Sequence, residues 1–525
     1  MSLQIVHLPN GQNLQVSPVF GGLFFKSSEL SHTHSPFPAG WTIVLNSEDG
    51  DEDEDMEDTA ASEQMTDQET RNKRIHRFRR PTLRNDHLYI SSISNSNSND
   101  FKPAGSPTRQ IAMMLWATLW WYFHQPEPDT RITTKQSMYT AEEGKPRGDW
   151  RININREGIF KGKVLLPKLE RMGLIASEDS TVGLDQGDKV GEGWLHMFVS
   201  RRTFWQLDPR LYLYTSIALA HSPYLTGSPY TSRPSSPSND PKHDSPDPQP
   251  PTSSGLWSSS VQGPFHSTSH LPTYFPPPPQ QYTFTNHVRH PIRPKPPRQG
   301  EVFYTRYIPS LGQYLSFRVA SLSPKAPPHR GPSAATPPSV AQFRHSQLDW
   351  PPTSGPAPQG PSDLDLLHKW MNEPRVSAAW GEAGPRARQE AFLKASLSSR
   401  HSFPVIGCWD GRPFGYFELY WAKEDMLGRY VDGIGHFDRG IHCLVGEDEF
   451  RGPARVRAWL SALVHYFWLV DGRTDCVIME PRVDNVKLTQ YCFEAGFYKE
   501  REIAFPHKQA SLLKIRRDAW EAPVI

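Results

Sequence analysis

Apolar and polar positions in the first half of the chain alternate over short runs and then recur at helical spacing. Alternation broken by the turn residues Pro9-Asn10-Gly11 and Gly21-Gly22 predicts a group of strands near the start. Apolar residues three and four positions apart predict helices over residues 109–124 and 164–172, the second ending at Gly173. The strands predicted in this half cover residues 3–8, 14–19, 23–25, 87–93 and 194–207.

The last third of the chain carries the same two patterns more densely. Residues 455–469 place apolar side chains on one side, as a helix packed on a sheet requires; these are Val456, Trp459, Leu460, Leu463, Val464 and Phe467. The other predicted helices cover residues 364–371 and 391–397, and a last one ends at Gly496-Phe497. The predicted strands cover residues 302–308, 314–320, 405–409, 414–421, 441–445 and 476–479, and two more follow before the C-terminus.

The order of these patterns in the first half recurs late in the chain. The first half has a strand, a polar loop, a Trp-rich helix, a helix ending in Leu169-Glu-Arg-Met-Gly-Leu174 and a segment with Ser200-Arg-Arg-Thr-Phe-Trp205. The matching later parts are residues 441–445, the loop after them, and residues 458–469, 491–497 and 515–520. We interpret this as an internal duplication with a degenerate first copy.

The first copy is assigned no catalysis, because only Phe101-Lys-Pro-Ala-Gly105 follows its strand where the second copy has a loop of Arg and Gly. A winged helix is the alternative for this half. A short helix, then Gly173-Leu-Ile175, then a strand also suits that fold.

Pro-rich segments divide the chain, whose 525 residues have room for two folded halves. Pro occurs 51 times and is concentrated in blocks that cannot build a core. We expect an N-terminal domain over residues 1–221, in which residues 48–73 form a disordered acidic loop. A disordered linker over residues 222–299 then leads to a second domain over residues 300–525, with a Pro-rich insertion over 323–361.

Charge and targeting signals limit the classes of partner and the cellular location that the sequence suggests. The formal net charge of +1 gives no argument for a nucleic-acid or membrane partner, so we expect neither. No apolar run approaches the ~20 residues of a membrane span. The start, Met1-Ser-Leu-Gln-Ile5, is not that of a signal peptide, and Ala522-Pro-Val-Ile525 is not a peroxisomal address. The expected location is the cytoplasm.

The four cysteines are Cys408, Cys443, Cys476 and Cys492, all in apolar positions of the last third. They form no Cys-x-x-Cys pair and no Cys/His ligand spacing. We therefore expect reduced core thiols and no metal.

Candidate chemistry centres on Gly440-Ile-His-Cys-Leu-Val-Gly446 and the residues after it. An apolar strand with a single imidazole, a loop of Arg and Gly, and then a helix is the order of parts that holds a phosphate-bearing cofactor beside a proton acceptor.

Five motifs around that stretch resemble the GNAT acyltransferase superfamily, and more narrowly its siderophore branch, which acylates N-hydroxylated ornithine or lysine side chains. The motifs are His368-Lys-Trp-Met-Asn-Glu-Pro-Arg375, Gly415-Tyr-Phe-Glu-Leu-Tyr-Trp421, Asp438-Arg-Gly-Ile-His442, Glu480-Pro-Arg-Val-Asp-Asn485 and Ala495-Gly-Phe497. The resemblance covers roughly residues 300–525 and implies an α/β fold in which a mixed, splayed sheet is flanked by helices. It makes the first half a degenerate GNAT-like α+β domain.

The resemblance also implies where an acyl-CoA co-substrate binds. Its pantetheine is expected to enter between the strand of His442 and the strand ending near Met479, and to pair with backbone groups of Cys443, Leu444 and Val445. Its pyrophosphate is expected on the amides of the next loop and helix start. That loop comprises Phe450, Arg451, Gly452, Pro453, Ala454 and Arg455, and both arginines add charge. The loop departs from the superfamily pattern at its first position, where Glu449 stands.

His442 is the expected general base, because a hydroxylamine nitrogen is neutral at pH 7 and an imidazole with a pKa near 6.5 suits the proton that it releases. Asp484 is expected to orient His442 or the hydroxylamine, with a helix N-cap as the alternative. Asn485 is either that cap or a substrate contact. The other expected substrate contacts are Tyr420, Trp421, Glu480 and Lys508.

The predicted activity is direct transfer of an acetyl group from acetyl-CoA to N5-hydroxyornithine, with no covalent enzyme intermediate. One alternative is a related enzyme that uses N6-hydroxylysine, a protein amine or a bulkier acyl-CoA. A second is a non-enzymatic regulator with a winged-helix first half and an acyl-CoA-sensing second half. A homodimer remains open.

Overall fold

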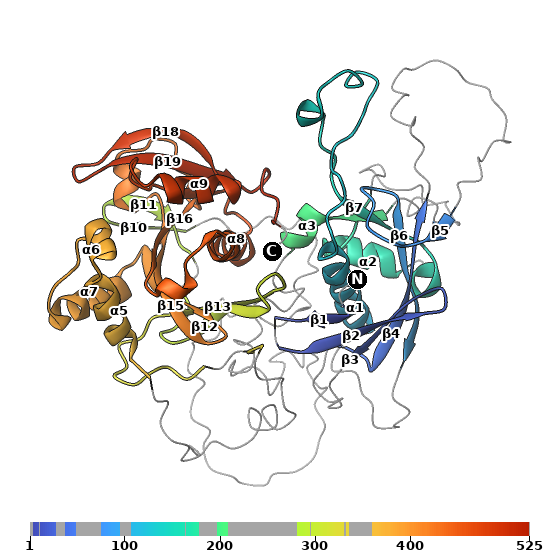
Figure 1. Cartoon of the computed structure of the whole chain (residues 1–525), viewed down its shortest axis with the longest axis horizontal. Helices are drawn as coiled ribbons and strands as arrows, with labels where there is room; N and C mark the ends of the chain where they lie inside the picture. The colour runs from blue at the N-terminus through green and yellow to red at the C-terminus, as the bar shows by residue number, and fades with distance from the viewer. Residues whose placement is uncertain are drawn as a thin grey trace, which may run out of the picture.

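The computed structural model describes residues 4–9, 11–27, 37–48, 75–94, 107–162, 164–177, 197–207, 281–293, 296–329, 332–334 and 360–523. These residues form two sheets in two halves of the molecule, each covered by helices (Figure 1).

The first half is built on a sheet of nine strands in the order β1-β2-β3-β4-β6-β7-β9-β8, with β5 paired on β4. The strands are β1 (Ile5–His7), β2 (Asn13–Val19), β3 (Gly22–Ser27), β4 (Gly40–Glu48), β5 (Ile75–Arg77), β6 (Asp86–Ser94), β7 (Arg151–Ile154), β8 (Ala176–Ser177) and β9 (Met197–Ser200). Its helices are α1 (Pro107–Phe123), α2 (Leu165–Arg171) and α3 (Arg201–Trp205), with 3-10 turns η1 (Glu142–Gly144) and η2 (Gly158–Lys161).

The second half is built on a sheet of eight strands in the order β12-β13-β14-β15-β16-β17-β19-β18. The strands are β12 (Val302–Ile308), β13 (Gln313–Val319), β14 (Ser402–Trp409), β15 (Arg412–Trp421), β16 (Arg439–Val445), β17 (Cys476–Met479), β18 (Tyr498–Ala504) and β19 (Gln509–Arg516). Its helices are α5 (Asp363–Met371), α6 (Pro374–Trp380), α7 (Arg386–Ser398), α8 (Pro453–Val470) and α9 (Val486–Glu494), with 3-10 turns η7 (Met426–Arg429) and η8 (Asp448–Phe450).

Both sheets follow the same order from one edge to the other. Among the described strands, each sheet has one parallel pair, β6 with β7 and β16 with β17, in the same place in the order. A long buried helix joins each parallel pair, α1 in the first sheet and α8 in the second, and α2 and α9 follow in turn. This common topology supports an internal duplication, and it rules out the winged-helix alternative, because a nine-stranded sheet occupies that half.

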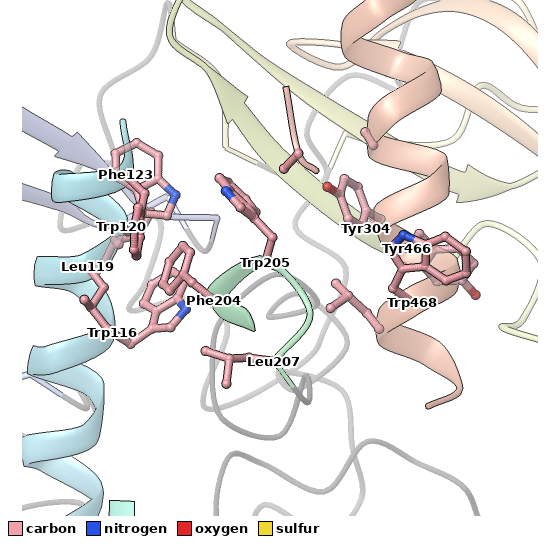
Figure 2. Close-up of a cluster of buried hydrophobic side chains, with 14 of the residues drawn as sticks. Trp116, Leu119, Trp120, Phe123, Phe204, Trp205, Leu207, Tyr304, Tyr466 and Trp468 are labelled. Atoms are coloured by element: carbon pink, nitrogen blue, oxygen red, sulfur yellow. The ribbon is translucent and has the colours of Figure 1, made fainter. Parts of the chain in front are cut away.

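The two halves share one continuous core (Figure 2). Helix α3 lies between α1 and α8, and its Trp205 ring meets the ring of His465 at 5.3 Å and the guanidinium of Arg306 at 4.2 Å. Trp205 and Arg306 are 2% and 1% exposed, so their contact is shielded from solvent. On another side, the Tyr314 hydroxyl donates to Leu8 O at 3.3 Å. The halves therefore pack as one body.

Three sequence predictions differ from the structure. The strand predicted over residues 194–207 ends at Ser200, whose hydroxyl caps α3 by accepting from Thr203 N. The end of the predicted linker forms a hairpin, β10 (Tyr282–Thr285) with β11 (Val288–Pro291), because Asn286 and the residue after it take the positive φ angles that a tight hairpin turn needs. Helix α6 was not predicted, since Pro374, which begins it, is equally typical of a loop.

Several other expectations lie wholly or mostly outside the described residues. They concern the acidic loop, most of the linker, most of the 323–361 insertion, and residues 101–105. Among the residues that are described, none of the helices has the length and apolar character needed to cross a membrane. The described His, Cys, Asp and Glu side chains also form no group of three or more suited to a metal ion.

Candidate active site

The two central strands of the second sheet part beyond a short parallel ladder. β16 pairs with β15 over its whole length, from Trp421↔Arg439 to Gly415↔Val445, but with β17 only at Arg439↔Val477 and Gly440↔Ile478. Within the described chain, the edge of β16 from Ile441 onward thus has no strand beside it on the β17 side. Strand edges present N–H and C=O groups in a row, so this gap can receive an extended amide-bearing molecule.

One side chain already reaches the outer end of that edge. Arg375, near the start of α6, donates from Nη1 to Val445 O and from Nη2 to Gly446 O, both at 2.7 Å. Its guanidinium is also 3.2 Å from Asp448. Farther along, the Arg482 Nη1 donates to Ala378 O of α6 at 3.2 Å. Helix α6 is therefore tied to both walls of the gap.

The loop after β16 leads into the N-terminus of α8. Gly452 takes φ 126°, which favours glycine, and Pro453 begins the helix, so the amides of the first turn are not used inside α8. The Arg451 side chain is exposed and lies 3.3 Å from Asp448. Arg455 instead lies over the ring of Phe450 and donates to Gln313 at 3.0 Å. Of the two predicted phosphate contacts, Arg451 is therefore at the surface and Arg455 is engaged elsewhere.

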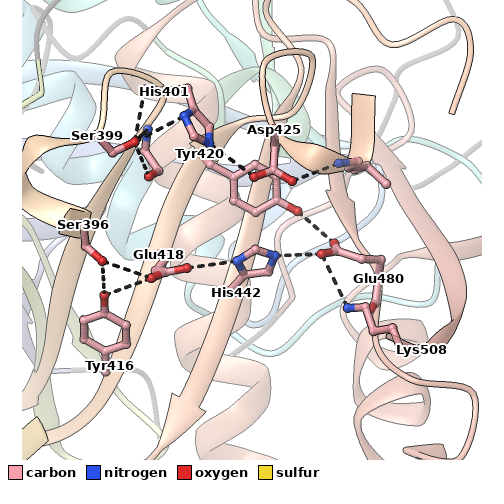
Figure 3. A network of polar contacts seen from close by, with 12 residues as sticks. Ser396, Ser399, His401, Tyr416, Glu418, Tyr420, Asp425, His442, Glu480 and Lys508 are labelled. Atoms are coloured by element: carbon pink, nitrogen blue, oxygen red, sulfur yellow. Dashed lines mark hydrogen bonds and ion pairs between the residues drawn. The ribbon is translucent and has the colours of Figure 1, made fainter. Parts of the chain in front are cut away.

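His442 lies just beyond the last parallel pair, between two carboxylates (Figure 3). Its Nδ1 is 3.1 Å from Oε2 of Glu418, and its Nε2 is 2.7 Å from Oε1 of Glu480. Glu418 stands opposite His442 in the β15–β16 register, whereas Glu480 follows the end of β17 across the gap. The imidazole therefore spans the point where the strands part.

Further polar groups hold both carboxylates. The hydroxyls of Tyr416 and Tyr420 donate to Glu418 at 3.0 Å and to Glu480 at 2.8 Å. The ammonium of Lys508 donates to the backbone oxygen of Glu480 at 2.8 Å. The predicted residues Tyr420, Glu480 and Lys508 are thus brought together around His442, with Glu480 buried at 6% exposure.

The charge state of His442 differs from the prediction. Burial disfavours the charged ring, but Glu480 and Glu418 outweigh it and raise the pKa of His442 well above its ordinary value. The pKa of Glu480 is lowered although burial opposes this, because His442 and Lys508 favour its ionised form. The surroundings of His442 therefore differ from the expectation of an ordinary imidazole with a pKa near 6.5, because the two carboxylates favour the charged ring.

Three other predicted residues lie apart from the imidazole nitrogens. Asp484 is exposed and pairs with Arg482 at 2.8 Å, so its predicted role of orienting His442 is wrong, since Glu418 and Glu480 already bind both nitrogens. Asn485 caps α9, its side chain accepting from Leu488 N. The Trp421 ring lies against two guanidinium groups, that of Arg439 at 3.8 Å and that of Arg293 at 4.2 Å.

Sequence reasoning missed Glu418, Tyr416 and Trp380. Glu418 and Tyr416 lie within the 415–421 motif, and the one-to-one register of β15 with β16 was the signal that could have placed Glu418 opposite His442. The ring of Trp380, on the unpredicted helix α6, meets His442 edge-on at 6.4 Å.

The corresponding place in the first sheet is filled. Beyond the pair Leu88↔Ile154, the chain turns into η2, where Gly158 lies so near β6 that a Cβ on it would stand 2.1 Å from Ile90 O. His87 lies beside this parallel pair with Glu48 at 3.3 Å and the Asn155 amide at 2.9 Å. By the register of the two parallel pairs, Ile90 stands where the second sheet has His442, so the described residues of the first copy provide neither this imidazole nor an open gap.

Comparison with known proteins gives consistent results. A family model described as acetyltransferase (GNAT) domain matches residues 360–505. The N5-hydroxyornithine acetylase sidL of Beauveria bassiana (strain ARSEF 2860) is 46% identical over 97% of this chain and 100% of its own length. The hydroxyornithine transacylase SID3 of Ajellomyces capsulatus is 33% identical over 48% of this chain and 50% of its own. The N(6)-hydroxylysine O-acetyltransferase of Escherichia coli is 37% identical over 43% of this chain and 58% of its own.

Proposed function

Because the chain belongs to the GNAT-superfamily acyltransferase family that contains the sidL acetylase, and is an N-acyltransferase, we propose that it transfers an acetyl group from acetyl-CoA to the hydroxylamine nitrogen of N5-hydroxyornithine. One observation carries the proposal above all. The imidazole of His442 and its two carboxylates lie where β16 and β17 part, beside a strand edge open to an extended co-substrate.

The residues of the second sheet fit an acyl-CoA. Cys443 presents its backbone groups to the gap, because neighbouring residues of a strand alternate and the amide of Gly446 donates the other way, to Phe414 in β15. The unused amides at the start of α8, with the positive end of that helix, suit a pyrophosphate, and the exposed Arg451 adds a cation. Acetyl-CoA supplies an activated thioester, and the chain supplies position and a proton acceptor.

The proton of the attacking nitrogen goes to the unit of Glu418, His442 and Glu480. The unit contains two carboxylates, and a carboxylate is a group that can accept a proton. Tyr420 holds the carboxylate of Glu480, Lys508 holds the backbone oxygen of Glu480, and Tyr416 holds the carboxylate of Glu418. Such fixed groups need no reorganisation when charge moves.

A cytoplasmic location belongs to the proposal. All four cysteines are free in the structure, as suits a reducing compartment.

The test uses the purified full chain with acetyl-CoA, and follows the release of CoA thiol. Release is expected with N5-hydroxyornithine and at background level with ornithine, whose side-chain amine is protonated at pH 7. His442→Ala is expected to lower turnover by about 10²-fold or more, because it removes the group that holds both carboxylates. N6-hydroxylysine and a bulkier acyl-CoA are run beside the proposed pair. Faster turnover with either would replace the corresponding substrate in the proposal, and wild-type turnover by His442→Ala would remove the site assignment.

A further inference from the structure

The hydrogen-bond geometry around His442 fixes where its protons are. Each ring nitrogen faces a carboxylate oxygen, at 3.1 Å for Glu418 and 2.7 Å for Glu480. A carboxylate oxygen is an acceptor, so the arrangement is fully satisfied when the ring donates from both nitrogens. A ring that donates from both nitrogens has no lone pair left for another proton. The group predicted to be the base therefore holds its proton already.

The two carboxylates differ in where they point. Glu418 is turned away from the gap, toward Tyr416 and the Ser396 hydroxyl of α7, which lies 3.4 Å from its Oε1. Glu480 stands at the end of β17, on the wall of the gap facing the open edge of β16. Glu480 thus follows the end of β17, at the point where β16 and β17 part, which is where the proposed function puts the thioester.

We propose that Glu480 is the residue that accepts the proton of the attacking nitrogen, and that Glu418 is a positioning residue that keeps His442 between the carboxylates as an imidazolium. This rests on the proposed function and names the proton acceptor of that same site. His442 then acts through its charge, by holding Glu480 ionised and in place.

The chemistry balances without any other reactant. The nitrogen lone pair forms a bond to the thioester carbon, and the nitrogen becomes positively charged and strongly acidic. Its N–H proton passes to Glu480, the C–S bond breaks, and the sulfur leaves with the electron pair. Glu480 then returns the proton to the thiolate, which gives the hydroxamate, free CoA and the starting carboxylate. Because the proton comes from a cationic nitrogen, a weakly basic carboxylate is sufficient.

The groups that face this unit come from several elements. Glu418 and Tyr420 lie on β15, and Lys508 stands before β19, with its ammonium 3.8 Å from Glu480 Oε1. Asp425, in the loop after β15, is paired with His401 at 3.3 Å, and its pKa is lowered in part by the positive charge of His442. The ring therefore has three carboxylates within its electrostatic reach, and Lys508 is the cation that opposes them.

The test combines kinetics with a direct reading of the ring charge. Glu480→Gln keeps the shape of the side chain and is expected to lower kcat/KM by about 10²-fold or more at every pH. Glu480→Asp, which keeps a carboxylate, is expected to recover part of the lost kcat/KM. Glu418→Gln is expected to lower the pKa of His442, followed by NMR of 13C-labelled histidine with His442→Gln for assignment. The activity of this variant should fall further below that of the wild-type protein as the pH rises, because its ring loses the proton at a lower pH.

Two results would overturn the proposal. One is a Glu480→Gln enzyme within about threefold of wild type across the pH range, which would return the base role to the imidazole. The other is a His442 ring that is neutral at pH 7 in the wild-type protein. The NMR titration needs no substrate, so it reports the charge of His442 whether or not the protein acts on hydroxyornithine. A wild-type protein that leaves hydroxyornithine unreacted would refute the proposed function, not the charge of the ring.

Discussion

Substitution of Trp205 by Ala tests whether the two halves unfold as one unit. The indole is 2% exposed and lies between the two halves, with His124, just after α1, at 5.4 Å and His465 of α8 at 5.3 Å. Burying about 200 Å² of aromatic surface at roughly 25 cal/mol/Å² is worth up to about 5 kcal/mol. The substitution also removes the aromatic ring that lies against the buried guanidinium of Arg306. We expect a loss of ~3–5 kcal/mol in the free energy of unfolding.

The assay is urea unfolding read by two signals. Far-UV circular dichroism follows both sheets, whereas the reactivity of the thiols follows only the second half, because all four cysteines lie there. If the halves form one cooperative unit, both midpoints fall together in Trp205→Ala. Tyr139→Ala is the matched control, since that ring is 96% exposed and its loss should change stability by less than ~0.5 kcal/mol. A thiol midpoint that stays at the wild-type value while circular dichroism shifts would refute the reasoning.

Three further predictions concern the second half. Gly440→Ala should abolish most turnover, because the new Cβ would stand 2.0 Å from the Tyr420 ring, while Gly472→Ala, with nothing within 4 Å, should match wild type in the same thiol-release assay. Asp363→Ala should lower the free energy of unfolding in urea by ~3–5 kcal/mol, because the buried Arg318 guanidinium would lose the carboxylate that accepts two hydrogen bonds from it. An equal loss on removal of an exposed carboxylate would contradict this. The native thiols should react slowly with a disulfide reagent at pH 8, because burial raises the pKa of Cys443 to about 12, and fast labelling of the folded protein would count against the packing described.

The sequence predicted the elements that apolar periodicity encodes and missed those that depend on register. The strand over residues 476–479 and the helix over 455–469 appear as β17 and α8 with little change, because their runs are apolar and sharply bounded. Internal repetition suggested that elements of the first half recur in the second, but the strands over residues 40–48 and 151–154 were not predicted. Helix α6 was not, since its seven residues are too short for a periodic signal and begin with Pro374.

The charge state of His442 could not be predicted from its own neighbourhood in the sequence. It depends on Glu418, 24 residues earlier, and on Glu480, 38 residues later, and only the register of β15 and the place where β17 ends bring these together. Asp484 was an attractive partner because it follows the same strand. Arg482, two residues before it, takes that carboxylate instead, within the turn in which Asn485 N donates to Arg482 O.

The duplicated first half explains how a surface loop at the proposed phosphate site can be held in place. Helix α8 carries that loop at its N-terminus, and an isolated amphipathic helix on a sheet would leave its other side in water. Here His465 and Trp468 on α8 are fully or nearly fully buried, and His465 meets Trp205 of α3. Among the described residues of the first copy, η2 closes the gap and Ile90 stands where the second copy has His442. Helix α3 of the first half covers α8 through the contact of Trp205 with His465, so we expect the second half produced alone to be less stable, although it keeps every residue of the site.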